Sequence, residues 1–542
     1  MHADRSRAIP VAIRSWLLLA AVAASAGDWP QWGGRNERNF ASDETGLPEV
    51  FGPPRESGGG TNTGAAATVP GTNLLWTARL GTITYSTPAV VGGRVYLGSN
   101  DERLDHPRVR RSGGGVILCF DAATGRRAWQ FPVPRLKTRN KLFNFDDLKL
   151  GICSSPTVVG DRLYLVSSRG EVLCLDTRGQ ADGNDGPYVD EGRYMADTAE
   201  RPDKPGRFDP AAGPPPPEPV ELGQEDGDIV WCFDFIRDLD VWAQDAVDCS
   251  PLVIGDHVWL SPSVGVDRSH KFIPSPHAPN LMVLDRRSGA LLATNAAPYS
   301  ARVFHGEWSS PTLVRAGGGE LVVWGGGDGV CRAYDTRIAA GAGGAPGVLE
   351  EVWRFDANPP HNKTRDGRPL PYNKNKEGPS EIIATPVFDG HRVFVGVGQD
   401  SRHGPGPGCF SCFDPTGRGD ITENGKVWQS FDVQRSFSSA AVAAGLAVVA
   451  DYTGIVHCFD AATGARLWTH DLDARVFGSP LAADGRIYIG DEKGYVTVFA
   501  LAREKRLLHS VRLDSAVYTT PVAVNGTLFS AASKTLYAFR AP

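Results

Sequence analysis

The sequence predicts an all-β protein, a single eight-bladed β-propeller of four-stranded antiparallel blades closed by the N-terminal strand. Two segments far apart in the chain, FDAATGRRAW (120–129) and FDAATGARLW (459–468), are nearly identical. The final tryptophan of the second segment follows Trp428 by 40 residues and precedes its next counterpart, His509, by 41. A four-stranded propeller blade repeats every ~40–45 residues. Gly-Asp, Asp-Gly and Asn-Gly turns between apolar segments indicate tight β-hairpins.

Seven of the eight repeats begin with a strand that starts at a proline, preceded by a small or hydroxyl-bearing residue, and Ala440 takes the place of the proline in the sixth. Proline is tolerated there because the hydrogen-bond ladder loses little at the first residue of a strand. Second strands such as RVYLGS (94–99) and RIYIGD (486–491) alternate with the period of two that is typical of β-structure. The eight anchor positions are Pro88, Pro156, Pro251, Pro311, Pro386, Ala440, Pro480 and Pro521.

The fourth, outer strand of most repeats carries a tryptophan. The last repeat ends after its third strand, TLYAF (535–539), whereas Trp76 lies before the first inner strand. The segment LLWTARL (74–80) should therefore supply the missing outer strand of the last blade, and this closure removes two exposed sheet edges. The outer-strand positions are Trp76, Trp129, Trp231, Ala293, Trp353, Trp428, Trp468 and His509.

The repeat has a recognisable signature, D-x-x-x-G-x-x-x-W. It stands at Asp121, Gly125 and Trp129, and again at Asp460, Gly464 and Trp468. This spacing resembles the repeat of the pyrroloquinoline-quinone-like (quinoprotein alcohol dehydrogenase-like) β-propeller superfamily, and the similarity runs through residues 74–540. In that family the outer tryptophan packs between blades, so the resemblance implies a structural role for Trp76, Trp129, Trp231, Trp353, Trp428 and Trp468. Blades 3 and 7 depart from the signature at Ala293 and His509.

The chain lacks one feature of the catalytic branch of that superfamily. Alcohol dehydrogenases of the family carry two adjacent cysteines in a strained ring, a tryptophan beneath the quinone, and a calcium ion held by Glu, Asn and Asp. No two cysteines are adjacent in this sequence. No cofactor is therefore expected. A PQQ-dependent oxidoreductase with pyrroloquinoline quinone and calcium is the first alternative, because some quinone propellers lack the cysteine pair.

The N-terminus is typical of an export signal. Arg5, Arg7 and Arg14 precede or flank an apolar stretch at 16–24, which small residues follow at 24–26. We expect a signal peptide at 1–26, an N-terminal extension at 27–73 and the propeller at 74–540. A periplasmic or secreted location follows, with no integral membrane segment in the mature chain.

The net charge and the placement of the cysteines restrict the partners and the kinds of site that the chain is expected to have. The net charge is −6, so no basic field is available to hold a nucleic-acid backbone. The nine cysteines include four at equivalent repeat positions, two residues before an aspartate: Cys119, Cys174, Cys412 and Cys458. Such cysteines are expected to be small buried residues of strands rather than a disulfide framework. The C-x-x-C pair of Cys409 and Cys412 has no second pair at zinc-like spacing.

Long loops gather on one face, where chain segments lead into the inner strands and connect the second and third strands. We name this the loop face. Its insertions are 99–115, 130–153, 235–249, 261–280, 296–309, 357–384 and 399–409, all in blades 1–5. Loops on a rigid scaffold commonly carry binding residues. The leading hypothesis is a non-catalytic binding or scaffold protein for a protein, peptide or glycan. A resemblance to the propeller of outer-membrane protein assembly agrees with that class, although neutral loop drift is the alternative.

The largest insertion, 177–228 in blade 2, lies on the opposite face. Between 181 and 228 it holds 13 Asp/Glu and four Lys/Arg, and it contains a run of four prolines. This composition predicts a solvated acidic loop.

Three loop-face residues are candidate metal ligands. His305 and Glu307 are two positions apart, so an extended chain would point both side chains the same way. His403, from the next blade, could complete a set of imidazole and carboxylate ligands for a divalent metal. A metal-assisted hydrolase is therefore the second alternative, against ordinary hydrogen-bonding roles for the same residues.

Overall fold

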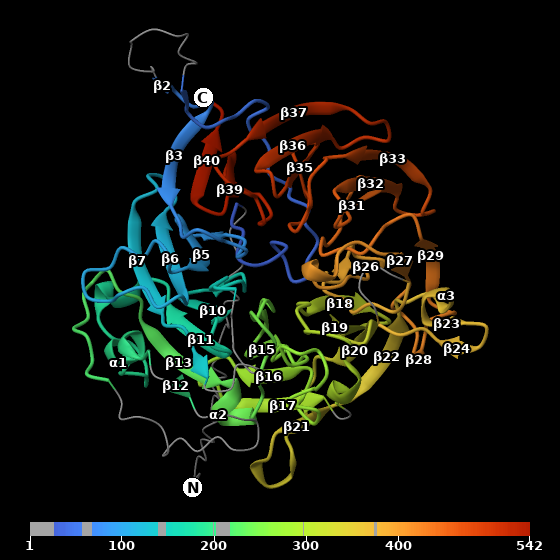
Figure 1. Cartoon of the computed structure of the whole chain (residues 1–542), viewed down its shortest axis with the longest axis horizontal. Helices are drawn as coiled ribbons and strands as arrows, with labels where there is room; N and C mark the ends of the chain where they lie inside the picture. Colours follow the sequence, from blue (N-terminus) through green and yellow to red (C-terminus); the bar gives the residue numbers. More distant parts are fainter. Residues whose placement is uncertain are drawn as a thin grey trace, which may run out of the picture.

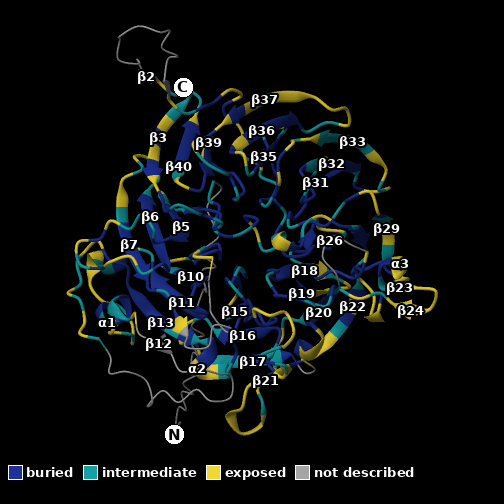
Figure 2. Ribbon diagram, viewed as in Figure 1, coloured by how far each residue is buried: buried dark blue, intermediate teal, exposed yellow. Residues whose placement is uncertain are grey.

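The predicted fold class is confirmed. The computed structural model describes residues 27–56, 68–138, 148–198, 200–201, 217–295, 298–372 and 377–542, so the signal peptide predicted at 1–26 lies outside the described residues. Eight antiparallel sheets follow one another around a central axis as propeller blades (Figure 1). Buried residues concentrate in the strands, and exposed residues follow the outer rim (Figure 2).

Strands pair antiparallel in chain order within each blade, from the axis outward. Blade 1 consists of β4 (Ala89–Val91), β5 (Arg94–Asn100), β6 (Gly115–Asp121) and β7 (Arg127–Val133). Blade 2 consists of β9 (Thr157–Val159), β10 (Arg162–Val166), β11 (Glu171–Asp176) and β13 (Ile229–Asp234). Blade 3 consists of β14 (Leu252–Ile254), β15 (His257–Leu260), β16 (Met282–Asp285) and β17 (Leu291–Asn295). Blade 4 consists of β18 (Thr312–Ala316), β19 (Gly319–Gly325), β20 (Val330–Asp335) and β22 (Glu351–Asp356).

The second half of the ring repeats this order. Blade 5 consists of β25 (Val387–Phe388), β26 (Val393–Gly396), β27 (Phe410–Phe413) and β29 (Lys426–Ser430). Blade 6 consists of β30 (Ala441–Ala443), β31 (Leu446–Ala450), β32 (Ile455–Asp460) and β33 (Arg466–Asp471). Blade 7 consists of β34 (Leu481–Ala483), β35 (Arg486–Gly490), β36 (Tyr495–Ala500) and β37 (Leu507–Arg512). Blade 8 consists of β38 (Val522–Val524), β39 (Thr527–Ala531), β40 (Thr535–Arg540) and the N-terminal β3 (Leu74–Arg79), which closes the ring as predicted.

Several short strands and helices lie outside the four-stranded blades. Two strands extend blades 3 and 4 by parallel pairing, β21 (Gly347–Leu349) on β17 and β28 (Gly419–Asp420) on β22. Small ladders join β1 (Arg55–Glu56) to β2 (Thr68–Val69), β8 (Lys137–Thr138) to β12 (Glu200–Arg201), and β23 (Thr364–Arg365) to β24 (Arg368–Pro369). The α-helices are α1 (Glu191–Ala196), α2 (Phe235–Leu239) and α3 (Pro360–Lys363). The 3-10 helices are η2 (Gly179–Asp182), η4 (Ser300–Arg302), η5 (Ala342–Gly344) and η6 (Ser401–His403).

The blades are joined around the axis by a closed ring of hydrogen bonds, the hydroxyl ring. The residue before each anchor position donates its backbone N–H to the hydroxyl of the equivalent residue in the next blade. The distances are 2.9–3.4 Å at all eight junctions between described residues, and Thr520 closes the ring by donating to Thr87. The participants are Thr87, Ser155, Ser250, Ser310, Thr385, Ser439, Ser479 and Thr520. The hydroxyl residue noted before each proline is thus a link between blades.

A second set of links lies at the outer strands, where the predicted tryptophans are all buried. Trp428 donates its indole N–H to the carbonyl of Ala461 in the next blade at 3.0 Å, and a Cβ at Gly464 would lie 2.6 Å from the Trp428 ring. Trp76, Trp129, Trp231 and Trp468 donate in the same way, at 3.0–3.1 Å. The glycine of the repeat signature therefore makes room for the tryptophan of the preceding blade.

The two departures from the signature have structural compensations. In blade 3, Ala293 pairs with Gly347 of the additional strand β21. In blade 7, the His509 Nε2 lies 2.8 Å from the carbonyl oxygen of Phe51, and the two rings pack with centroids 5.2 Å apart. The N-terminal extension thus fills the place that a tryptophan occupies elsewhere.

Residues 29–44 of the N-terminal extension form an axial segment, which crosses the centre of the ring in Figure 1. This segment hydrogen-bonds to all eight blades. Backbone bonds reach Val90, Val158, Leu313, Phe388 and Ala482 of the inner strands. Side chains reach the remaining blades: Arg38 contacts Pro251, Asn39 contacts Val442, and Glu44 accepts from the N–H of Gly526. The axial segment thus supplies hydrogen-bond partners to the edges of the inner strands, which would otherwise face the central channel unpaired.

Arg38 is the most constrained residue of the axial segment. Its guanidinium is fully buried, and its five N–H groups match five oxygen acceptors at 2.8–3.3 Å. The acceptors are the carbonyls of Trp32, Ser250, Pro251 and Pro311 and the side-chain oxygen of Gln31. One cation therefore ties the segment to blades 3 and 4.

The acidic insertion is solvated as predicted over part of its described length, since 181–184, 186–187 and 189–190 are exposed. Other parts are packed, because some of its carboxylates and aromatic residues find partners that composition does not reveal. Helix α1 buries Tyr194 and Met195, and Phe131 of blade 1 packs against Tyr194. Asp226 is fully buried, 2.7 Å from His106 and 2.6 Å from Arg108.

The cysteine expectation is confirmed, since all nine cysteines lie in described segments and are free, and all except the half-buried Cys232 are buried. Within the described ranges, none of the helices has the length and apolar character needed to cross a bilayer.

The tryptophan pocket can be tested with one glycine pair. Gly464 and Gly485 have similar positive φ angles, 72° and 68°, but a Cβ at Gly485 would meet no atom within 4 Å. Replacing Gly464 with Ala should lower the free energy of unfolding by about 1–3 kcal/mol more than Gly485→Ala, because overpacking adds to the shared backbone strain. Urea denaturation of both variants measures the difference, and equal losses would contradict this role for the glycine.

The axial cation can be tested by a substitution that keeps its charge. Arg38→Lys leaves three donors for five acceptors, and each buried carbonyl without a partner costs about 1–3 kcal/mol. We expect a clear drop in the thermal unfolding midpoint. The control is Arg35→Lys, three residues away, where the side chain is 65% exposed and pairs with Asp43. That control should leave the midpoint almost unchanged, and a similar shift in both variants would argue against the anchoring role of Arg38.

Candidate functional site

A cavity of about 190 Å³ lies on the propeller axis at the loop face. Each blade contributes the residue three positions before its anchor: Tyr85, Cys153, Asp248, Trp308, Ile383, Phe437, Phe477 and Tyr518. Several members of the hydroxyl ring line it as well. Trp32 of the axial segment also lines the cavity, and its indole N–H donates to the Thr385 hydroxyl at 3.0 Å. Residues of all eight blades and of the axial segment therefore line the cavity.

Aromatic rings form one wall of the cavity. Tyr85 and Tyr518 stack with centroids 4.7 Å apart, and Phe477 meets the Tyr518 ring edge-on at 4.9 Å. Phe437 stacks on Phe477 at 5.6 Å. We call these four residues the aromatic arc. They come from blades 8, 7 and 6 and from blade 1, which follows blade 8 in the closed ring.

Carboxylates form the facing wall. Among the described lining residues, Asp245, Asp248 and Asp400 lie together with one guanidinium, that of Arg402. Arg402 bonds to Asp245 at 2.5 Å and to Asp400 at 3.2 Å. The Oδ1 atom of Asp248 is buried and has no hydrogen-bond partner within the described segments. This wall is net negative.

The protonation of Asp248 depends on its surroundings. Burial raises the pKa of Asp248 to about 7. A hydrogen bond from Cys153 opposes the rise, whereas the neighbouring charges of Asp245 and Asp400 add to it. Asp248 consequently titrates near neutral pH.

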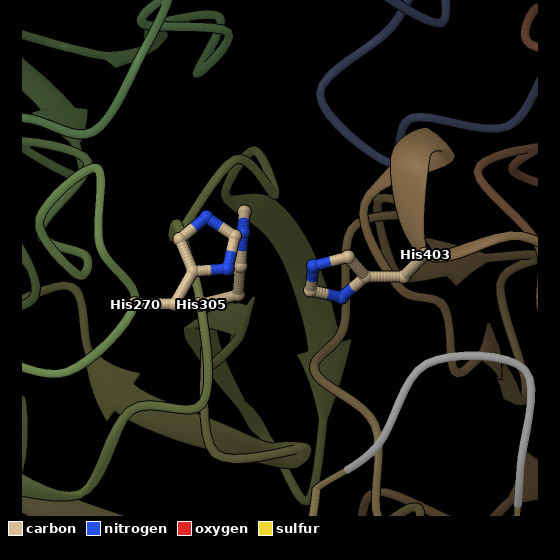
Figure 3. A group of neighbouring side chains, drawn as sticks. All are labelled: His270, His305 and His403. Atoms are coloured by element: carbon tan, nitrogen blue, oxygen red, sulfur yellow. The ribbon is translucent and has the colours of Figure 1, made fainter.

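Three histidines from three blades converge beside the cavity (Figure 3). His270 lies in the loop between β15 and β16, His305 in the segment before β18, and His403 at the end of η6. One ring nitrogen of each lies within 4.8 Å of the others. His305 and His403 are buried and His270 is exposed. Trp308, which lines the cavity, packs against the His305 ring at 5.2 Å, so the two features are neighbours.

Local turns position His270 and His403. The Asp267 carboxylate accepts hydrogen bonds from Ser269, Lys271 and Phe272, which folds the loop tip around it. His270, inside that turn, has a φ of 57°, in the left-handed region that few non-glycine residues adopt. Asp400 caps η6 by accepting from the backbone N–H of Arg402 at 2.7 Å.

Hydrogen bonds orient the two buried imidazoles. The Tyr372 hydroxyl lies 3.0 Å from His403 Nδ1 and donates to Glu381 Oε1 at 3.1 Å. The Gln244 amide nitrogen lies 2.8 Å from His305 Nε2, and the Gln244 oxygen accepts from the backbone N–H of Val266. Burial lowers the pKa of His305 to about 3, with Asp400 opposing the shift and His270 adding to it. His305 is therefore neutral at ordinary pH.

The structure brings together two of the three residues predicted as metal ligands. His305 and His403 meet with ring centroids 5.0 Å apart. Glu307 points elsewhere: it accepts from the Asn280 amide at 3.0 Å and from the Gly327 backbone N–H at 3.2 Å. Burial raises the pKa of Glu307 to about 8. Its polar contacts serve the packing of blades 3 and 4.

Sequence reasoning missed His270 and the cavity lining. His270 lies within the insertion 261–280, which was recognised as a loop-face segment, but no spacing rule connects it to His305. The cavity lining did have a readable signal. Aligning the eight repeats on their anchors places the same eight residues at position −3, where blades 6, 7, 8 and 1 share an aromatic side chain.

Comparison with known proteins agrees with the geometry. The family described as outer membrane protein assembly factor BamB matches residues 58–186 and 412–541. The crystal structure of BamB from Moraxella catarrhalis superposes with a TM-score of 0.50 at 15% identity, covering 86% of this chain and 97% of that chain. At that identity the likeness speaks for the fold alone. No curated protein sequence matches the chain significantly.

Two quinoprotein structures are similar at a lower level. A quinohemoprotein alcohol dehydrogenase from Comamonas testosteroni gives a TM-score of 0.47 at 11% identity, over 96% of this chain and 81% of that chain. A europium-containing methanol dehydrogenase gives 0.47 at 11% identity, over 95% and 98%. These likenesses are too weak to support an inference about function.

Proposed function

We propose that this pyrroloquinoline-quinone-like β-propeller is a non-catalytic binding protein whose axial cavity receives an organic ammonium group. The ammonium group belongs to a small molecule or to a partner that docks on the loop face. We place this activity outside the cytoplasm, on the basis of the signal peptide predicted at 1–26.

The observation that carries this proposal is the pairing of the aromatic arc with Asp248. Aromatic faces attract cations through their quadrupoles, by about 0.5–2 kcal/mol each, depending on solvation. Asp248 offers a hydrogen-bond acceptor and a negative charge on the facing wall, because its Oδ1 atom is buried and has no hydrogen-bond partner among the described residues. Sets of aromatic rings with an acidic group are the usual recognition chemistry for ammonium ions.

The charge balance supports a cation rather than an anion. Among the described residues that line the cavity, the carboxylates of Asp245, Asp248 and Asp400 outnumber the guanidinium of Arg402. In a partly desolvated site, like charges a few ångströms apart repel by about 4 kcal/mol at an effective dielectric constant of 20. Pyrroloquinoline quinone carries three carboxylates, so these residues do not fit it, and we propose no reaction through a quinone.

Choline, with the neutral isostere 3,3-dimethylbutanol as reference, probes the cavity directly. We expect isothermal titration to show saturable choline binding at least about tenfold tighter than that of the isostere, which corresponds to ~1.4 kcal/mol. Asp248→Asn should abolish this preference. Asp256→Asn makes the same change in an exposed turn of the same blade and should leave it intact. Equal affinity for choline and its isostere would refute the proposal.

The same titration has a predicted pH dependence. Asp248 has a pKa of about 7, so it becomes ionised as the pH rises through neutrality. Choline affinity should therefore increase between about pH 6 and about pH 8 and then level off. Cys153, Asp245 and Asp400 act on the pKa of Asp248, and Tyr85 and Cys249 also interact electrostatically with it. The increase should be absent in Asp248→Asn, and a falling affinity over this range would contradict the role of Asp248.

The quinone alternative predicts the opposite ligand preference. We expect equilibrium dialysis of the chain against pyrroloquinoline quinone in excess calcium to show no binding above that of an unrelated protein. Saturable one-to-one binding at micromolar affinity would overturn the non-catalytic proposal and favour the oxidoreductase.

A further inference from the structure

We propose that His270, His305 and His403 bind one divalent transition-metal ion, with zinc as the preferred ion and a fourth coordination position left for water or a ligand. This site goes beyond the proposed function and does not depend on it. Neither the family match nor the similar structures point to it; the side-chain geometry does.

The first argument is convergence. Three loops from blades 3, 4 and 5 place one nitrogen of each imidazole within 4.8 Å of the others. Zinc–nitrogen bonds of about 2.0–2.1 Å in a tetrahedral site separate two ligand atoms by about 3.4 Å. The three rings therefore need to move inward by about 1 Å. His270 is exposed at the tip of its loop, and its ring packs against those of His305 and His403 with centroids 4.9 and 5.3 Å away.

The second argument is the hydrogen-bond direction at His403. The Tyr372 hydroxyl donates its proton to Glu381 Oε1, which also accepts from the Asp400 backbone N–H at 3.2 Å. The tyrosine oxygen must then accept from Nδ1–H of His403, 3.0 Å away. This tautomer leaves Nε2 of His403 with its lone pair. A metal-binding histidine commonly donates its second N–H to such a chain ending in a carboxylate.

The third argument concerns His305. Its neutral ring has one lone pair, which it shares with the Gln244 amide in the present arrangement. Metal binding exchanges that hydrogen bond for a coordinate bond, while the Gln244 oxygen keeps its bond to Val266. Three imidazoles with an open position are an established ligand set for zinc. The nearby carboxylates of Asp245 and Asp400 outnumber the charge of Arg402 and favour a cation.

Metal titration of the full chain tests the proposal. After treatment with EDTA and dialysis, zinc sulfate should bind at one ion per chain by elemental analysis, and cobalt should give the visible absorption of a tetrahedral site. His270→Ala should weaken zinc binding by about a hundredfold or more. Because His270 is exposed, this variant should fold, and circular dichroism with thermal unfolding verifies that.

Control variants separate this ligand set from others. His391→Ala removes an exposed histidine in a hairpin turn of blade 5 and should bind zinc normally. Glu307→Gln should also keep one zinc per chain, whereas a loss there would favour the ligand set predicted from sequence. Tyr372→Phe, which removes the group that orients His403, should weaken zinc binding by about tenfold. Absence of saturable zinc and cobalt binding, or binding unchanged in His270→Ala, would overturn the proposal.

Discussion

The hydroxyl ring is the constraint on which the molecule depends. A propeller is closed only if each blade meets the next and the last meets the first. Here the anchor proline has no N–H, so the residue before it supplies the donor at the edge of the inner strand. That residue also accepts through its hydroxyl from the preceding blade. A serine or threonine therefore serves both neighbours, and the Ser/Thr-Pro pattern of the sequence encodes the closure.

The closed ring leaves an axial channel whose walls are the edges of the inner strands. The axial segment supplies hydrogen-bond partners to those edges at one end of the channel only. It satisfies inner-strand N–H groups two residues after the anchors, at Val90, Val158, Leu313, Phe388 and Ala482. The positions three residues before the anchors remain uncovered. The cavity is thus the part of the channel that the segment does not fill, which explains why all eight blades line it.

Sequence patterns predicted the blades, their closing strand and the buried tryptophans, because each depends on local periodicity that repeats eight times. The axial segment occurs once, so no internal comparison could reveal that Arg38 reaches blades 3 and 4. Glu307 was grouped with His305 on the assumption of extended backbone. The chain around Gly306 is not a regular strand, and the Glu307 carboxylate accepts from the Asn280 amide instead of pointing toward His305. His270 reaches His305 and His403 only through the tertiary fold of its own loop.

The two walls of the cavity follow from loop length. Blades 6–8 have minimal turns, so they can present only the residue that leads into the strand, and there they present Phe437, Phe477 and Tyr518. Blades 3–5 have long loops that reach over the axis with carboxylates and imidazoles. Burying the polar ring nitrogens of His305 and His403 costs desolvation. Buried polar groups that break the local rules of stability are expected mainly at functional sites, and these imidazoles and carboxylates meet that description.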